Sequence, residues 1–307
     1  MIFDDRRCEL GEGPLWHPTR QQLFWFDILG QKLLSQDRTG PREWRFPEIA
    51  SAAGWVSDDV LLIAGERDLF LFDLETEEVE TLCLLEADKP KNRPNDGRAD
   101  PQGGFWIGTM GKKAEAGAGA FYRYHRGELR QLYAGISIPN STCFAPDGKS
   151  ACFSDTTTRK VMRVALDAEG WPLGAPEVYL DLTAQGLNPD GAVIDATGVL
   201  WLAEWGASRV AAYAPDGSFL RAVEFDAPHT SCPAFGGPNL TALLCTSALQ
   251  DMDAAARAAH PNAGDARCWR GAGRCCRPDA RSADCRCPSG SDASARNRAR
   301  RGFPRHA

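Results

Sequence analysis

The sequence contains no long hydrophobic run, and this absence limits the class of protein. No stretch approaches the ~20 consecutive apolar residues that a membrane-spanning helix needs. The first residues, MIFDDRRCELGEG, are polar and acidic, unlike a secretory signal. We therefore expect a soluble, cytoplasmic protein that does not bind membranes. Its 307 residues, of which 43% are hydrophobic, suffice for one large domain or two ordinary ones.

Several common catalytic and metal-binding motifs are also missing. Before residue 265 the cysteines show no C-x-x-C or other zinc spacing, so we expect the free thiols of a cytosolic chain. The five histidines form no H-E-x-x-H motif and no cluster, which favours solvated or packing roles for them. No G-x-S-x-G motif occurs, and a serine esterase is therefore disfavoured.

Charge is distributed unevenly along the chain. Residues 265–307 contain 11 Arg, no Lys and 4 Asp, although the whole chain has a net charge of −6. The remaining residues are therefore strongly acidic. An acidic body argues against nucleic acid as a partner.

Helical periodicity is scarce, and short alternating apolar runs such as QQLFWFDI, GFWIGTM and VLWLAEW predict strands and hairpins. One pattern, a small or polar residue followed by a short apolar strand, a turn and an aromatic strand, recurs at intervals of about 40 to 50 residues. Its six starts lie near Glu12, Ala52, Asn95, Asn140, Asp190 and Ser231. This repeat predicts an all-β, six-bladed β-propeller with the active site on its central axis. A pair of β-sandwiches is the alternative, but no interdomain linker is evident.

Asp190 stands out among three Pro-Asp-Gly triplets. The copies at 146–148 and 215–217 fall between strands, where hairpin turns belong. Pro189-Asp190-Gly191 instead begins the first strand of its repeat. Because the innermost strands of a propeller line a central channel, Asp190 can converge there with Glu12, Asn95 and Asn140 from equivalent places in other repeats. Carboxylates and amide carbonyls are suitable ligands for a hard divalent cation.

The chain resembles a known family in five separated motifs that occur in that family's order. They are E-L-G-E-G-P-L-W (9–16), R-P-N-D-G (93–97), G-T-M (108–110), I-P-N (138–140) and P-D-G (189–191). The family is that of senescence marker protein, gluconolactonase and regucalcin, and the resemblance covers about residues 8–260. Some members have Phe at the position of Pro94, a difference that we regard as tolerable.

The resemblance implies a carboxylic ester hydrolase that opens sugar lactones with one divalent cation. Glu12, Asn140 and Asp190 would be the metal ligands, and Arg93 and Asn95 would bind the substrate. The cation (Ca, Zn, Mn, Mg or Fe(II)) would polarise the lactone carbonyl and activate water, and Asp190 would be the catalytic base as well as a ligand. The alternative is a non-catalytic propeller that binds calcium or serves as an interaction scaffold.

The resemblance stops before residues 265–307, which contain no Leu, Ile, Val or Lys but 5 Cys. Such a composition offers little to a core, so we place the propeller at residues 1–264 and expect residues 265–307 to form a disordered tail. Cys285-x-Cys287 misses the usual zinc spacing. The mix of Arg, Ala, Gly, Pro, Cys and Ser suggests the hypothesis of a frameshift near residue 264. The sixth blade should then lack a strand after this point, although the segment from Ile2 to Leu10 can still close the ring.

Overall fold

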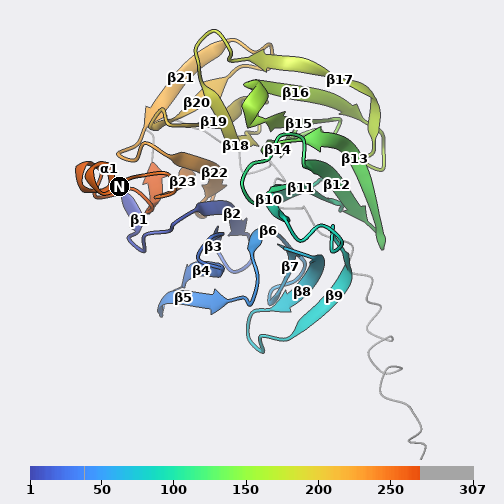
Figure 1. Ribbon diagram of the computed structural model, residues 1–307, viewed down its shortest axis with the longest axis horizontal. Helices are drawn as coiled ribbons and strands as arrows, with labels where there is room; N and C mark the ends of the chain where they lie inside the picture. Colours follow the sequence, from blue (N-terminus) through green and yellow to red (C-terminus); the bar gives the residue numbers. More distant parts are fainter. Residues whose placement is uncertain (38, 270–307) are drawn as a thin grey trace, which may run out of the picture.

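The computed structural model describes residues 1–37 and 39–269. These residues form six four-stranded sheets in which neighbouring strands run antiparallel. The sheets surround one axis like blades, and the predicted six-bladed β-propeller is confirmed (Figure 1). Within the described part of the chain, no helix is long and apolar enough to cross a membrane.

Each of the first five blades uses four consecutive strands, counted from the axis outward. Blade 1 contains β2 (Gly11–His17), β3 (Gln22–Asp27), β4 (Lys32–Asp37) and β5 (Gly40–Arg45). Blade 2 contains β6 (Ala50–Trp55), β7 (Val60–Gly65), β8 (Asp68–Asp73) and β9 (Val79–Leu84). Blade 3 contains β10 (Asn92–Ala99), β11 (Phe105–Gly111), β12 (Gly119–His125) and β13 (Glu128–Ile136). Blade 4 contains β14 (Pro139–Phe144), β15 (Ser150–Asp155), β16 (Lys160–Leu166) and β17 (Pro172–Asp181). Blade 5 contains β18 (Asn188–Ile194), β19 (Leu200–Trp205), β20 (Arg209–Tyr213) and β21 (Phe219–Glu224).

The sixth blade joins both ends of the described chain. From the axis outward it contains β22 (Thr230–Gly236), β23 (Ala242–Ser247), β24 (Ala266–Trp269) and β1 (Ile2–Asp4). The backbone N–H of Cys268 donates to the carbonyl of Met1 at 3.0 Å, and Ile2 pairs with Arg267. The N-terminal segment therefore closes the ring, as expected.

The prediction that the sixth blade lacks a strand after residue 264 is wrong. Strand β24 lies beyond that boundary, and its Ala266 and Cys268 are buried in the core. A strand of four residues needs only two inward-facing side chains here, and small Ala and Cys fill those places without Leu, Ile or Val. Residues 270–307 lie outside the described residues, and so do the disorder and frameshift predictions made for them.

Two short helices accompany the strands in the described part of the chain. Helix α1 (Ala254–Ala259) lies near the N-terminus in Figure 1, between β23 and β24 in the sequence. The side chain of Asp253 caps it by accepting a hydrogen bond from the N–H of Ala256 at 2.8 Å. A 3₁₀ turn, η1 (Thr156–Thr158), connects β15 to β16.

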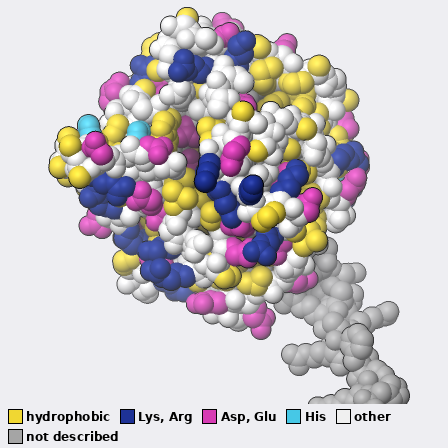
Figure 2. Space-filling view, viewed as in Figure 1, with side chains coloured by type: hydrophobic (Ala, Val, Ile, Leu, Met, Phe, Trp, Pro, Cys, Tyr) yellow, Lys and Arg dark blue, Asp and Glu magenta, His cyan; other side chains and the backbone are white. Residues whose placement is uncertain are grey.

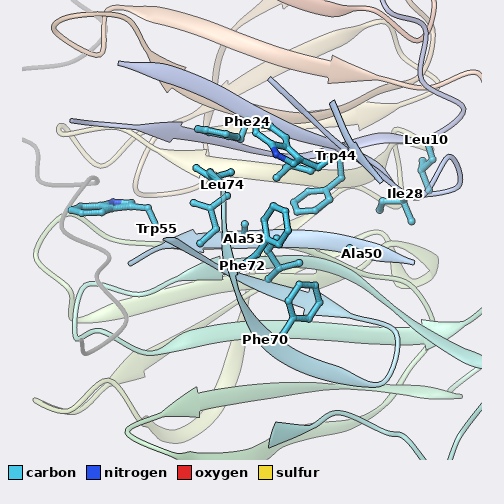
Figure 3. Close-up of a cluster of buried hydrophobic side chains, with 14 of the residues drawn as sticks. Leu10, Phe24, Ile28, Trp44, Ala50, Ala53, Trp55, Phe70, Phe72 and Leu74 are labelled. Atoms are coloured by element: carbon cyan, nitrogen blue, oxygen red, sulfur yellow. The ribbon is translucent and has the colours of Figure 1, made fainter. Parts of the chain in front are cut away.

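Apolar side chains fill the spaces between neighbouring blades. Figure 3 shows this between blades 1 and 2, where Trp44 of β5 meets Phe72 of β8 edge to face at a centroid distance of 6.4 Å. Because each blade is covered on both faces, middle strands such as β3 are buried at every residue. Outer strands are edges, and exposed apolar residues such as Val79, Leu84 and Phe219 lie on them.

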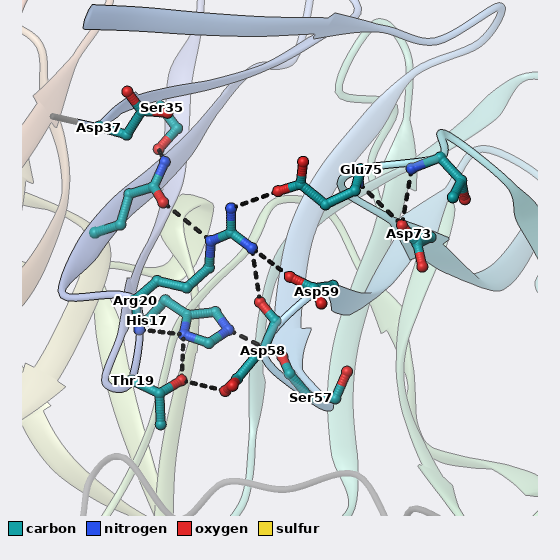
Figure 4. A network of polar contacts seen from close by, with 12 residues as sticks. His17, Thr19, Arg20, Ser35, Asp37, Ser57, Asp58, Asp59, Asp73 and Glu75 are labelled. Carbon is teal, nitrogen blue, oxygen red and sulfur yellow. Dashed lines mark hydrogen bonds and ion pairs between the residues drawn. The ribbon is translucent and has the colours of Figure 1, made fainter. Parts of the chain in front are cut away.

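A polar network joins blades 1 and 2 at the turns that follow their inner strands (Figure 4). Arg20 donates to the carbonyl of Asp58 and forms ion pairs with Asp59 and Glu75. His17 is fully buried, and its Nε2 donates to the carbonyl of Ser57 at 3.0 Å. Burial lowers the pKa of this histidine. His17 thus has a packing role, as the sequence indicated.

The surface seen along the shortest axis carries charges of both signs. Figure 2 shows Lys and Arg side chains close to Asp and Glu side chains, with apolar residues between them. No single sign of charge covers this face.

Candidate active site on the propeller axis

All six inner strands begin near the predicted repeat starts and surround the axis in Figure 1. In each of them the pairing register shifts just after its first residues, for example between Glu12 and Leu15 and between Pro189 and Ala192. Such a bulge bends a strand and redirects a side chain. The bulges therefore occur where the predicted site residues lie.

Gly13 shows why one of these bulges needs glycine. Its φ is +55°, a left-handed conformation that disfavours a side chain. A Cβ at this position would also lie 2.3 Å from the carbonyl oxygen of Ser51 on the next blade. The E-G-P sequence thus allows the first two blades to approach each other closely beside Glu12.

Buried serines hold the site backbone from neighbouring blades. Ser51 Oγ donates to the carbonyl of Asn95 at 2.6 Å, and Ser141 Oγ donates to the carbonyl of Asp190 at 2.6 Å. Ser231 Oγ similarly donates to the carbonyl of Gly11 at 2.5 Å. Each of these bonds joins adjacent inner strands, so the positions of the site residues depend on the closed ring.

A chain of side-chain hydrogen bonds links blades 3, 4 and 5. Arg93 Nη1 donates to Asn95 Oδ1 at 2.8 Å, and Asn95 Nδ2 donates to Asn140 Oδ1 at 3.1 Å. Asn140 Nδ2 in turn donates to Thr156 Oγ1 at 2.9 Å, and this hydroxyl donates to the carbonyl of Pro189. The predicted residue Asn95 is therefore in direct contact with both Arg93 and Asn140. Thr156, which the sequence did not reveal, is the link to the strand that carries Asp190.

Two buried carboxylates complete the site. Glu12 and Asp190 are 4% exposed, and neither takes part in an ion pair with another described residue. Burial, and next the charge of Asp96, raise the pKa of Glu12 to about 8. Burial, with the charges of Glu12 and Asp96, also raises the pKa of Asp190 well above its usual range. The carboxylates lie close enough to repel each other, and the more distant charges of Arg93 and Arg98 only partly offset the raised pKa of Glu12.

Arg93 is the one basic side chain among the described residues that line the site cavity. Burial lowers its pKa to about 10, while the charge of Glu12 opposes this effect. Its Nη1 also donates to the carbonyl of Pro94 at 2.9 Å. The guanidinium is therefore held in one orientation by its own strand.

The site residues line a cavity of about 180 Å³ at one mouth of the channel. All five predicted site residues contribute to its wall: Glu12, Arg93, Asn95, Asn140 and Asp190. Trp205 also lines it, and its ring stacks on His229 at a centroid distance of 4.3 Å. Trp106, by contrast, is completely buried against Phe144 and does not reach the cavity.

Glu12, Asn140 and Asp190 offer oxygen atoms, the kind of ligand that hard divalent cations prefer. Because Asn140 Nδ2 is engaged by Thr156, its Oδ1 faces Asn95, which lines the same cavity. This amide oxygen and two unpaired carboxylates are ligands that divalent cations accept. Among the described residues, no three His, Cys, Asp or Glu side chains form a metal-type group. The predicted set contains only two such residues, and its third member is an amide.

Fold and site together define a six-bladed propeller with an acidic, small-molecule cavity on its axis. The chain belongs to the SMP-30/gluconolactonase/LRE-like family, whose model matches residues 10–249, and the resemblance noted in the sequence is thereby confirmed.

Relatives with a named activity align with most of the chain. A Rhizobium meliloti (strain 1021) protein named as a sugar lactone lactonase is 43% identical over 265 residues, which cover 85% of this chain and 90% of that protein. The L-arabinolactonase of Azospirillum brasilense is 33% identical, covering 86% of this chain and 89% of its own. The crystal structure of regucalcin from Agrobacterium tumefaciens strain C58, described as a calcium-binding protein, matches with a TM-score of 0.86 and 41% identity. That match covers 87% of this chain and 92% of the other.

Proposed function

We propose that the protein hydrolyses a sugar lactone to the free aldonic acid, using one divalent cation held by Glu12, Asn140 and Asp190. The observation that supports this most directly is the pair of buried carboxylates that form no ion pair with any described residue, next to an amide oxygen on the cavity wall. Leaving two such charges buried is costly unless a cation compensates them. Relatives named as sugar lactone and L-arabinolactone hydrolases support the choice of reaction.

The chemistry follows from the needs of a lactone, which is a cyclic ester. A divalent cation held by Glu12, Asn140 and Asp190 would supply Lewis-acid polarisation of the carbonyl and would make a water more acidic. Asp190 takes the proton of the attacking water as general base. Water adds to the carbonyl carbon, the ring C–O bond breaks, and the departing alkoxide receives a proton to become a hydroxyl group.

Arg93 and Asn95 orient the sugar in this proposal. The guanidinium supplies donors, and the Asn95 amide supplies both a donor and an acceptor, which matches a ring that carries several hydroxyl groups. The Arg93–Asn95 hydrogen bond presets both groups before substrate arrives. Their contacts act on substrate and transition state alike, and they therefore serve binding more than rate.

The similarity to a calcium-binding regucalcin favours one alternative, a propeller that binds calcium without catalysis. The same residues would hold the ion in both cases, so cation binding alone does not distinguish them. Lactone hydrolysis does, because only the enzyme opens the ring.

The decisive experiment measures hydrolysis of a panel of aldonolactones by protein stripped with chelator and reloaded with Ca, Zn, Mn, Mg or Fe(II). We expect activity to disappear on stripping and to return with at least one of these cations. Asp190→Ala should lower the rate by at least ~10²-fold, because it removes both a ligand and the base. Full activity in the stripped protein or in Asp190→Ala contradicts the mechanism.

A further inference from the structure

The axial channel contains a second cavity, separate from the site residues. Its volume is about 90 Å³, and its wall comes from the later parts of five inner strands, β2, β6, β10, β14 and β18, and from the turns after three of them. None of the five predicted site residues lines it. Because the inner strands begin at the site, their later residues lie toward the opposite mouth of the channel. We call this space the far cavity.

The wall of the far cavity is mainly apolar. Trp55 and Phe144 are buried beside it, while Leu15, Trp16 and Ile194 are half-buried and line it as well. Apolar side chains that stay partly open around a hollow, with a few polar groups among them, are typical of a small-molecule site. This wall favours a ligand with an apolar body.

Arg98 of β10 is the basic side chain in the described wall of the far cavity. It is half-buried, and it does not line the site cavity. Its Nε donates to the carbonyl of Thr142 at 3.0 Å and its Nη2 to the carbonyl of Ala192 at 3.1 Å, so bonds to blades 4 and 5 fix the guanidinium in the channel. The charge of Arg98 also lowers the pKa of Asp96, but Asp96 does not line the far cavity. An anion that enters the far cavity therefore meets the guanidinium without meeting Asp96.

Asp195 is the one acid in the described wall of the far cavity, and its oxygens are already engaged. Its Oδ1 accepts hydrogen bonds from the N–H of Thr197 at 2.8 Å and from the N–H of Val199 at 3.1 Å. Its Oδ2 accepts one from Trp201 Nε1 at 2.9 Å. The turn after β18 and strand β19 thus hold this carboxylate, which belongs to a residue only 5% exposed. The far cavity therefore presents a positive charge to a ligand and little negative charge.

We propose that the far cavity binds a small carboxylate with an apolar body, whose carboxylate contacts Arg98 and whose body packs against Leu15, Trp16 and Ile194. A guanidinium matches the planar geometry of a carboxylate, and such charged hydrogen bonds are stronger than neutral ones. An aldonic acid does not suit this cavity, because the hydroxyl groups along its chain would lie against apolar walls. The ligand therefore belongs to a different class from the proposed substrate and product, and its binding does not require lactone hydrolysis.

Ala145→Phe tests the site, because Ala145 lines the far cavity next to the exposed Pro146. An aromatic ring there should occupy the space that the ligand body needs. Ala214→Phe is the matched control, since Ala214 does not line the far cavity. Both alanines are half-buried and begin an Ala-Pro-Asp-Gly turn, in which the alanine carbonyl accepts a hydrogen bond from the glycine N–H.

The probe is benzoate, titrated into the full chain and followed by ligand-observed NMR. We expect saturable binding with a dissociation constant of about 1 mM or below, because a ligand of this size gains limited affinity. Ala145→Phe should weaken binding by at least about tenfold, because a filled cavity excludes the ring. Ala214→Phe should bind benzoate as the parent does. Benzyl alcohol keeps the ring but lacks the charge, and it should bind about tenfold more weakly than benzoate.

Benzoate binding to Arg93→Ala shows which cavity the probe occupies, because Arg93 lines the site cavity and not the far cavity. The affinity should be unchanged in this variant. Ala196→Phe, in the turn after β18, serves as the filling variant if Ala145→Phe does not fold. The proposal is overturned by an absence of saturable binding, by equal affinity for benzyl alcohol, by loss of binding in Arg93→Ala, or by unchanged binding in a folded filling variant. None of these results bears on lactone hydrolysis.

Discussion

At the residue scale, the site is built from charges whose burial is only partly compensated. Glu12 and Asp190 have no ion-pair partner among the described residues, while Arg93 is bound to its own neighbours Pro94 and Asn95. Three acids, Glu12, Asp190 and the exposed Asp251, and one base line the cavity, which therefore suits a positive ligand. The same arrangement separates the roles of the residues, since the acids face the cation and the arginine faces the sugar in the proposed mechanism.

Arg93→Ala should raise KM for sugar lactones by about 10- to 100-fold with a smaller change in kcat, because a charged hydrogen bond contributes ~1.5–3 kcal/mol. Steady-state kinetics with metal analysis checks this. The bound cation should remain, since Arg93 is not a ligand. Loss of metal from the variant would show that the assigned role is wrong.

Trp205→Ala should raise KM by about fivefold, because an indole in contact with a substrate ring contributes on the order of 1 kcal/mol. Trp205 lines the cavity, and its stacking on His229 holds the ring in place. Trp205→Phe retains an aromatic face and should recover most of the affinity. An unchanged KM in the alanine variant contradicts a substrate contact.

At the scale of the elements, the inner strands are joined to one another by side chains from turns and bulges. The contact between blades 1 and 2 in Figure 4 is an example, in which His17 at the end of β2 bonds to the turn after β6. The N–H of Arg20 donates to His17 Nδ1 at 3.3 Å, so this nitrogen must be unprotonated. The junction therefore requires a neutral imidazole.

This requirement predicts a pH dependence. Burial lowers the pKa of folded His17 from its ordinary value of 6.5, so below that pH the unfolded chain binds a proton that the folded chain does not. Stability should consequently fall as the pH drops below about 6.5. His17→Asn, which cannot titrate, should reduce this slope in chemical denaturation measured between pH 7.5 and 5.5. The same slope in parent and variant would exclude His17 as its source.

At the scale of the whole molecule, closure of the ring controls every inter-blade contact of the site. The first and last strands of the described chain pair in blade 6, and the N–H of Cys8 donates to the carbonyl of Gly264 at 2.9 Å. Ser231 in that blade also holds the backbone beside Glu12. A defect in blade 6 should therefore reach the axial site.

Truncation tests this closure. A chain that ends at residue 264 loses β24, and β1 then has no strand to pair with. A chain that ends at residue 270 retains every described strand. We expect the shorter chain to melt at a much lower temperature, or not to fold, while the longer one shows a cooperative transition. Equal melting temperatures would mean that β24 does not close the ring.

The sequence by itself determined the architecture and much of the site. Alternating apolar runs and a recurring strand pattern indicated six blades, because a blade covered on both faces requires apolar residues at a strand period. The same repeat placed Glu12, Asn95, Asn140 and Asp190 at the starts of inner strands, the family resemblance added Arg93, and the structure brings all five to one cavity. The composition after residue 264 gave a wrong prediction at β24, because Ala266 and Cys268 fill the buried positions there in place of larger apolar residues.

Only the tertiary structure decided which further groups meet at the axis. Asp96 reads as an ordinary Asn-Asp-Gly turn residue, and Thr156 follows a strand end with no distinguishing motif. Asp96 accepts a hydrogen bond from Thr142 of the next blade, and Thr156 bonds to Asn140 and to Pro189. These partners are far apart in the sequence, and local bulges set the direction of each side chain. Periodicity predicts which face of a strand is buried, but contacts between blades exist only once the ring has closed.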